Sequence, residues 1–131
     1  MSPEVPAPIL LVEDDETLRH LLAIQLRGRG YEVEEAASAE AAVAALVNGL
    51  RPALVLLDLN LPGDTGWDLI RGPRLAEAGS PPVVITSATT VNPRRLTEHA
   101  VAGYLPKPFA VETLFATIER LLNPEKEPEN A

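Results

Sequence analysis

Acidic, hydroxyl and ammonium side chains follow four separate apolar runs of the sequence. An acidic stretch at positions 13–15 comes after the first run, and Asp58 ends the second. Ser87 closes the third run, and Lys107 follows the fourth between two prolines. Carboxylates that lie close together raise one another's pKa unless a cation sits among them. If the chain brings these residues together, the combination is typical of a site that binds a cation and an anionic group.

The cation that fits such donors is Mg2+. The chain has no cysteine and only two histidines, which argues against thiolate and imidazole-rich metal sites. Mg2+ binds one or two carboxylates together with waters and phosphoryl oxygens. A phosphoryl group arriving at Asp58 would then meet a metal ion, the Lys107 ammonium and the Ser87 hydroxyl. Asp58 is the natural nucleophile, because a carboxylate can accept phosphorus to give an acyl phosphate.

Each of these residues taken alone also has a purely structural interpretation. Asp14 or Asp15 could cap a helix, and Asp58 could start a turn. Ser87 alone is more often a helix cap, and Lys107 alone is usually a solvated charge. The chain has only two lysines, however, and the other lies near the C-terminus. The joint placement of the four segments favours function over the structural alternatives.

Five short segments predict the strands that must position these residues. Residues 9–12, 53–57 and 83–86 are apolar at nearly every position, as in central parallel strands buried on both faces. Residues 31–35 alternate apolar and acidic side chains, which predicts an edge strand whose acidic side discourages pairing with another chain. A fifth strand is expected at 103–105, before Pro106.

Stretches with helical periodicity separate these strands. The first helix has an apolar face of Leu18, Leu21, Leu22 and Leu26. Ser38 is expected to cap the second helix, and the apolar stripe over residues 111–122 predicts the last. The third stretch, 67–78, contains Gly72 and Pro73, so that helix should end or kink near Arg71.

Strands that alternate with five helical stretches predict an α/β fold. We expect a doubly wound, five-stranded parallel sheet with helices on both faces, in three α/β/α layers. Ligands of such open sheets bind beyond the carboxyl ends of the strands, where the winding direction reverses. The polar residues described above follow the strands at that edge, so the sequence predicts one site there.

Composition limits the possible functions. The 131 residues suit one domain, which we expect over 9–122 with flexible tails at 1–8 and 123–131. A net charge of -8 argues against nucleic acid or an anionic membrane surface as a direct ligand. Neither an apolar run of about 18 residues nor a signal peptide is found, so we expect a cytoplasmic protein.

The motifs also match one known family, in order along the chain. Residues 9–15 (ILLVEDD), 54–66 (LVLLDLNLPGDTG), 83–88 (VVITSA) and 104–109 (YLPKPF) resemble the receiver domain of bacterial two-component response regulators. The resemblance extends over about residues 9 to 122 and is to single-domain, chemotaxis-type receivers. It implies the flavodoxin-like strand order 2-1-3-4-5.

The resemblance implies a role for each motif residue. Asp58 would be the phosphoacceptor, and Ser87 and Lys107 would assist it catalytically. The phosphoryl donor would be a phosphohistidine on a sensor histidine kinase or a phosphotransfer protein. By this reading the chain is a signalling switch that catalyses only its own phosphorylation and dephosphorylation, and it is not otherwise an enzyme.

The same resemblance implies a magnesium site and a switch. The Mg2+ ligands would be Asp14, Asp15, Asp58 and the backbone carbonyl of Asn60, and the peptide bond before Pro108 would be cis. The switch residues would be Ser87 and Tyr104. They would change the face formed by the fourth helix, the fifth strand and the last helix, which a downstream protein reads and through which phosphorylated copies can dimerise.

The chain departs from the family pattern before the switch aromatic. Residues 100–103 read Ala-Val-Ala-Gly where the family has glycine, alanine and two acids, and the segment from Ser87 to Lys107 is about two residues shorter. Pro93 suits the first turn of a helix, but only Leu96 and Ala100 then give it an apolar stripe. We therefore expect a short, weakly anchored fourth helix that phosphorylation orders.

Two other functions remain as alternatives. A pseudo-receiver would bind partners without phosphate, although such domains commonly lose a site residue that this chain retains. An aspartyl-phosphate hydrolase would place a second acid two positions after its nucleophile, where this chain has Asn60. We expect no DNA-binding or catalytic output domain within these residues, and the sequence leaves open whether the chain stands alone or is one domain of a longer protein.

Overall fold

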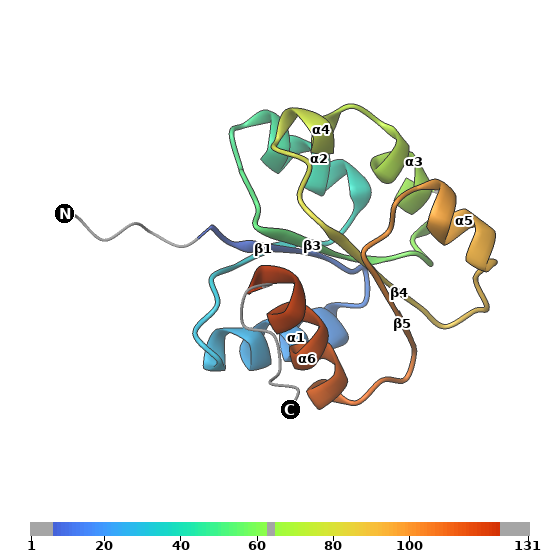
Figure 1. Ribbon diagram of the computed structural model, residues 1–131. Coiled ribbons are helices and arrows are strands. Elements are labelled where there is room, and N and C mark those ends of the chain that lie inside the picture. Colours follow the sequence, from blue (N-terminus) through green and yellow to red (C-terminus); the bar gives the residue numbers. More distant parts are fainter. Residues whose placement is uncertain (1–6, 63–64, 124–131) are drawn as a thin grey trace.

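A five-stranded parallel sheet forms the centre of the molecule (Figure 1). The computed structural model describes residues 7–62 and 65–123. Its strands are β1 (Ile9–Val12), β2 (Val33–Ala36), β3 (Leu54–Asp58), β4 (Val83–Ser87) and β5 (Gly103–Pro106). They lie side by side in the order β2-β1-β3-β4-β5. The α/β fold and the strand order 2-1-3-4-5 are therefore confirmed.

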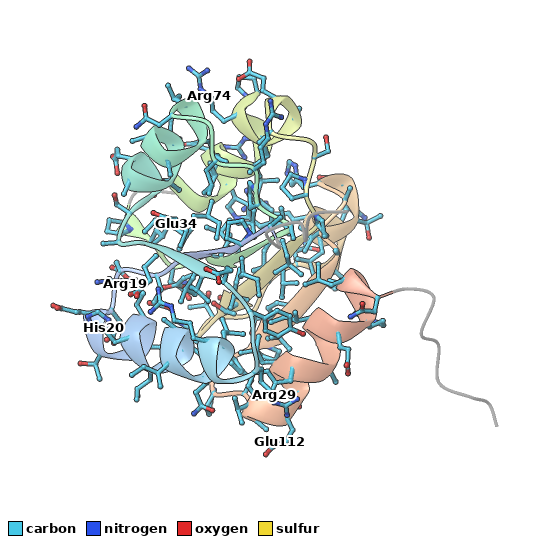
Figure 2. All side chains as sticks on the ribbon, turned by 90° about the vertical axis from the view of Figure 1, so that its left-hand side faces the viewer. Arg19, His20, Arg29, Glu34, Arg74 and Glu112 are labelled. Carbon is cyan, nitrogen blue, oxygen red and sulfur yellow. The ribbon has the colours of Figure 1, made fainter. Side chains whose placement is uncertain are left out.

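Helices cover both faces of this sheet, in the three layers that were predicted (Figure 1). The helices are α1 (Glu16–Gly28), α2 (Ala39–Val47), α3 (Thr65–Arg71), α4 (Arg74–Glu77), α5 (Pro93–Glu98) and α6 (Val111–Leu122). α1 and α6 pack on one face, and α2 to α5 pack on the other. Figure 2 shows Arg19, His20 and Arg29 on the first side and Arg74 on the second.

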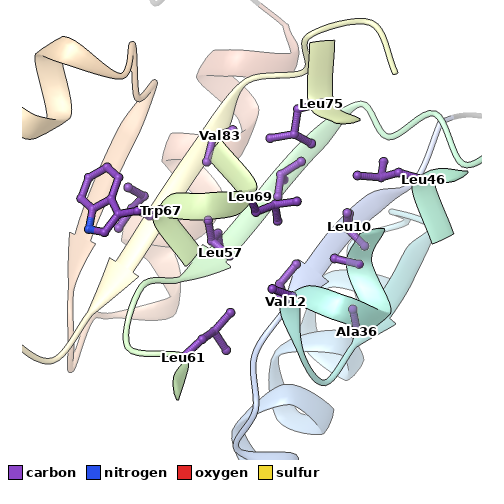
Figure 3. Packing of buried hydrophobic residues seen from close by; sticks show 14 of the residues in the cluster. Leu10, Val12, Ala36, Leu46, Leu57, Leu61, Trp67, Leu69, Leu75 and Val83 are labelled. Carbon is purple, nitrogen blue, oxygen red and sulfur yellow. The ribbon is translucent and has the colours of Figure 1, made fainter. Parts of the chain in front are cut away.

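Each face of the sheet has its own hydrophobic core, because successive strand residues point to opposite faces. In β1, Leu10 and Val12 pack against α2, whereas Ile9 and Leu11 face α1 and α6. Figure 3 shows the core beneath α2, α3 and α4. All residues of β1, β3 and β4 are buried, but Glu34 of the edge strand β2 is exposed. The contrast confirms which strands are central.

The helix ends follow local sequence signals. The Ser38 hydroxyl accepts a hydrogen bond of 3.0 Å from the backbone N–H of Ala41 and so caps α2 as predicted. α3 ends at Arg71, and the chain resumes as the separate short helix α4 beyond Gly72 and Pro73. The third predicted stretch is thus two helices.

The predicted apolar face of α1 is wrong at one position. Leu22 and Leu26 are buried, but the side chain of Leu21 is 53% exposed. The helix packs on the sheet through Leu22, Ala23 and Leu26, so Leu21 lies to one side of the contact. There it lines a groove toward Phe109, which is described below.

Two other expectations concern the chain ends and membranes. The proposed tails at 1–8 and 123–131 lie almost wholly outside the described residues. In the part of the chain that the structure describes, no helix has both the length and the apolarity needed to cross a membrane.

Candidate functional site

Strand register brings the ends of β3, β4 and β5 into one row. Asp58 pairs with Thr86, and Ser87 pairs with Pro106. Because the strands are parallel, their carboxyl ends meet at the same edge, so Asp58, Ser87 and Lys107 come from neighbouring positions there. Ser87 is fully buried, and its backbone carbonyl accepts a 2.7 Å hydrogen bond from the Lys107 backbone N–H.

Three carboxylates gather at this edge. Oxygens of Glu13, Asp14 and Asp58 all lie within 4.8 Å of one another. Glu13 is 2% exposed and Asp58 is 3% exposed, whereas Asp14 faces solvent. The cluster is therefore a buried pair of carboxylates with a third at its open side.

The Lys107 ammonium supplies the positive charge nearest to this cluster among the described residues. Its Nζ donates a 3.0 Å hydrogen bond to Glu13 Oε1 and lies 3.4 Å from Asp58 Oδ2. The peptide bond between Lys107 and Pro108 is cis, as the family resemblance implied. One lysine against three carboxylates leaves a net negative charge, which a divalent cation could balance. All three carboxylates offer oxygen donors, which suit Mg2+.

Burial raises the pKa of the Glu13 carboxyl above its ordinary value. The adjacent carboxyl group of Asp58 raises the pKa further. The hydrogen bonds from Lys107 and from the Asp15 backbone N–H oppose this rise. Lys107 therefore offsets only part of the cost of burying the Glu13 charge.

The structure does not bring Asp15 into this cluster, although the sequence analysis assigned it to the metal site. Asp15 is exposed and caps α1, where its Oδ1 accepts a 3.1 Å hydrogen bond from the Leu18 backbone N–H. Glu13 takes the interior position instead, because its backbone N–H continues the ladder by donating to Ala36 O at 3.0 Å. A helix that starts at Glu16 places its cap at Asp15, and this signal could have separated the two acids.

Two supporting contacts were not foreseen from the sequence. Arg19 Nη1 donates a 3.0 Å hydrogen bond to the backbone carbonyl of Glu13, and Arg19 Nε contacts Glu35 at 3.2 Å. Arg19 thereby ties the loop after β1 to α1 and β2. These contacts join two side chains and one backbone carbonyl from three segments, and nothing in local periodicity indicates them.

The remaining predicted residues form a chain of contacts leading away from Asp58. The Asn60 backbone N–H donates to Asp58 Oδ1 at 2.9 Å, and the Asn60 side chain reaches Ser87. Ser87 Oγ lies 2.9 Å from the backbone carbonyl of Thr89, to which the Tyr104 hydroxyl donates at 3.3 Å. Ser87 and Tyr104, the predicted switch residues, are thus connected through Thr89, which sequence reasoning missed.

The family model described as response regulator receiver domain matches residues 9–119. The chain belongs to this family. Receiver domains of this kind are the signalling switches of two-component systems and interact with histidine kinases and downstream partners.

Several relatives share the fold or a substantial part of the sequence. The DNA-binding response regulator MtrA of Mycolicibacterium smegmatis is 42% identical over 122 residues, which are 92% of this chain and 53% of MtrA. The chain thus spans about half the length of the curated relatives that it matches. The chemotaxis protein CheY4 of Vibrio cholerae has a TM-score of 0.80 at 29% identity, over 90% of this chain and 100% of CheY4. The non-phosphorylated receiver domain of HemR from Leptospira biflexa has a TM-score of 0.77 at 33% identity, over 89% of this chain and 94% of that domain.

Proposed function

We propose that Asp58 accepts a phosphoryl group from a phosphohistidine of a sensor kinase or phosphotransfer protein. The observation that supports this most directly is the setting of the Asp58 carboxylate. It is buried, its Oδ2 lies 3.4 Å from the Lys107 ammonium, and its Oδ1 accepts the Asn60 N–H at 2.9 Å. A carboxylate oxygen would attack phosphorus, the phosphorus–nitrogen bond to histidine would break, and the ring nitrogen would leave and take up a proton.

Glu13, Asp14 and Asp58 would hold Mg2+, joined by the backbone carbonyl of Asn60. The oxygen-only donor set and the net negative charge of the cluster support this assignment. Bound there, Mg2+ would neutralise charge on the carboxylates and on the incoming phosphoryl oxygens. In this proposal Glu13 takes the place of Asp15, because Glu13 lies in the carboxylate cluster and Asp15 caps α1.

Lys107 and Ser87 would bind the transferred group. The Lys107 ammonium already contacts Asp58 and would pair with a phosphoryl oxygen, and the Ser87 hydroxyl would donate to another. Movement of Ser87 would be passed to Tyr104 through Thr89, because the Thr89 backbone N–H donates to Ser87 Oγ at 3.0 Å and the Thr89 carbonyl accepts from the Tyr104 hydroxyl. The face of α5, β5 and α6 would then change for a downstream protein partner. The domain would catalyse only the gain and loss of its own phosphoryl group.

An apolar groove beside the site suits the phosphoryl donor protein. It has a volume of about 530 Å³ and is lined by Leu18, Leu21 and Leu22 of α1 and by Phe109, with Lys107 at its wall. Leu21 is exposed here, and Ile24, three residues further along α1, is 64% exposed. Since Lys107 belongs both to the groove and to the site, a protein seated on the groove lies next to Asp58.

Intact-mass measurement after incubation with acetyl phosphate and Mg2+ tests the proposal. The wild-type chain should gain the mass of one phosphoryl group in a base-labile form, and Asp58→Asn should gain none. Asp68→Asn, which removes an exposed carboxylate from α3, is the matched control and should be labelled like the wild type.

Two results would contradict the proposal. Equal labelling of wild type and Asp58→Asn would mean that another residue accepts phosphate. A wild-type chain that stays unlabelled by acetyl phosphate and by a phosphorylated histidine donor would instead be a phosphorylation-independent interaction module.

A further inference from the structure

The side chain of Asn60 bridges the loop after β3 and the loop after β4. Its Oδ1 accepts hydrogen bonds from the Ala88 backbone N–H at 2.8 Å and from Ser87 Oγ at 3.1 Å. Its Nδ2 donates to Thr89 Oγ1 at 3.2 Å. A backbone N–H can only donate, so the atom that faces Ala88 is the carboxamide oxygen.

Two donors that converge on one oxygen form an oxyanion subsite. These two lie directly beyond Thr86, which pairs with Asp58 in the sheet. Asn60 is also bonded to Asp58, because its backbone N–H donates to Asp58 Oδ1 at 2.9 Å. The Asn60 oxygen therefore accepts from two donors on the segment that directly follows the strand neighbour of Asp58.

We propose that the carboxamide oxygen of Asn60 occupies a phosphoryl-oxygen subsite made by the Ser87 hydroxyl and the Ala88 amide, and that it must leave before a phosphoryl group on Asp58 can bind there. The inference rests on the proposed function and deepens it. Asn60 is a positioning residue that competes with the phosphoryl group for the same donors. A phosphoryl oxygen is charged and accepts roughly twice as strongly as a neutral oxygen, so the exchange proceeds once Asp58 is modified.

The surroundings of Asn60 leave space into which its side chain can rotate. A cavity of about 340 Å³ lies beside it, lined among others by Trp67, Thr89 and Arg95. Asn60 itself is exposed, so rotation of its side chain displaces no core residue. Rotation of Asn60 would also break its hydrogen bond to Thr89 Oγ1. Thr89, whose backbone carbonyl accepts from the Tyr104 hydroxyl, would then be held less firmly.

Binding of beryllofluoride at saturating Mg2+, followed by backbone amide NMR, tests the competition. Asn60→Ala should bind this phosphoryl analogue about threefold to tenfold more tightly than wild type, the change expected from losing one ordinary competing hydrogen bond. The same substitution in a Ser87→Ala background should have a smaller effect, because one contested donor is already gone. Asn48→Ala, on the exposed residue that follows α2, is the control and should bind like wild type.

A second measurement needs no phosphoryl analogue. Hydrogen exchange of the Ala88 amide should be about tenfold faster in Asn60→Ala than in wild type, because its bond to Oδ1 is lost. If wild type binds beryllofluoride and Asn60→Ala binds it equally or more weakly, the competition is overturned and the proposed function stands. If wild type does not bind beryllofluoride at all, the proposed function fails and this inference falls with it.

Discussion

The strands β3 and β4, which end at Asp58 and Ser87, are held in place differently from α5, the helix that follows Ser87 in the chain. On one side, every residue of β3 and β4 is buried, and sheet register determines where Asp58 and Ser87 lie. On the other side, α5 has six residues, none of them buried. A side-chain cap from Asn92, whose Oδ1 accepts from the Arg94 N–H at 2.9 Å, begins that helix.

Contacts with one aromatic ring hold α5 in place. The Arg95 guanidinium lies 4.2 Å from the centre of the Trp67 ring, and the His99 ring lies 5.0 Å from it. Trp67 belongs to α3 and is only 4% exposed, so its ring is held in the core and gives α5 a fixed surface to pack against. Short helices depend on packing, and α5 has little of it. The comparison indicates a rigid site joined to a segment that moves at small energetic cost.

The same substitution in the two regions should give the largest difference. Leu57→Ala in β3 should lower the free energy of unfolding by about 3 kcal/mol, because it leaves a cavity in the core. Leu96→Ala in α5 should lower the free energy of unfolding by only about 1 kcal/mol, because Leu96 is only partly buried against that core. Urea unfolding of both variants measures the two values. Equal losses would mean that α5 is as integral to the fold as β3.

The next largest difference should be in Mg2+ affinity, between variants of the two acids Glu13 and Asp15, which follow β1. Glu13→Gln should weaken Mg2+ binding about tenfold, or about 1.4 kcal/mol, because it removes a buried carboxylate of the cluster. Asp15→Asn should leave Mg2+ affinity within about twofold, since this exposed side chain caps α1 and asparagine also caps helices well. Calorimetric titration of Mg2+ gives both affinities. A larger loss in Asp15→Asn than in Glu13→Gln would restore the ligand set expected from sequence.

The smallest effect concerns the contact between Arg95 and Trp67. Arg95→Ala should lower the free energy of unfolding by about 0.5 to 1 kcal/mol and should speed amide hydrogen exchange within α5. Arg29→Ala is the matched control, because Arg29 lies 4.0 Å from the Phe115 ring on the longer helix α6. That variant should leave exchange in α5 unchanged. Unaltered exchange in Arg95→Ala would show that α5 is held by other contacts.

Local patterns predicted most of the fold. The apolar runs of β1, β3 and β4 indicated central strands, since a strand buried on both faces must be apolar throughout. Gly72 and Pro73 indicated where α3 ends, because proline cannot continue a helix without losing a backbone bond. The short helix at Pro93 was also expected, and its ordering by phosphorylation stays a prediction.

The sequence by itself determined which elements form and which polar residues reach the edge of the sheet, because these depend on spacing between near neighbours. Only the tertiary structure decided which acid points inward. Glu13 meets Lys107 across 94 positions of the chain, while Asp15 caps a helix. It likewise decided that Asn60 meets Ser87, 27 positions away, through its side chain. Side-chain partners of this kind depend on the path of the chain between distant segments, which local periodicity does not specify.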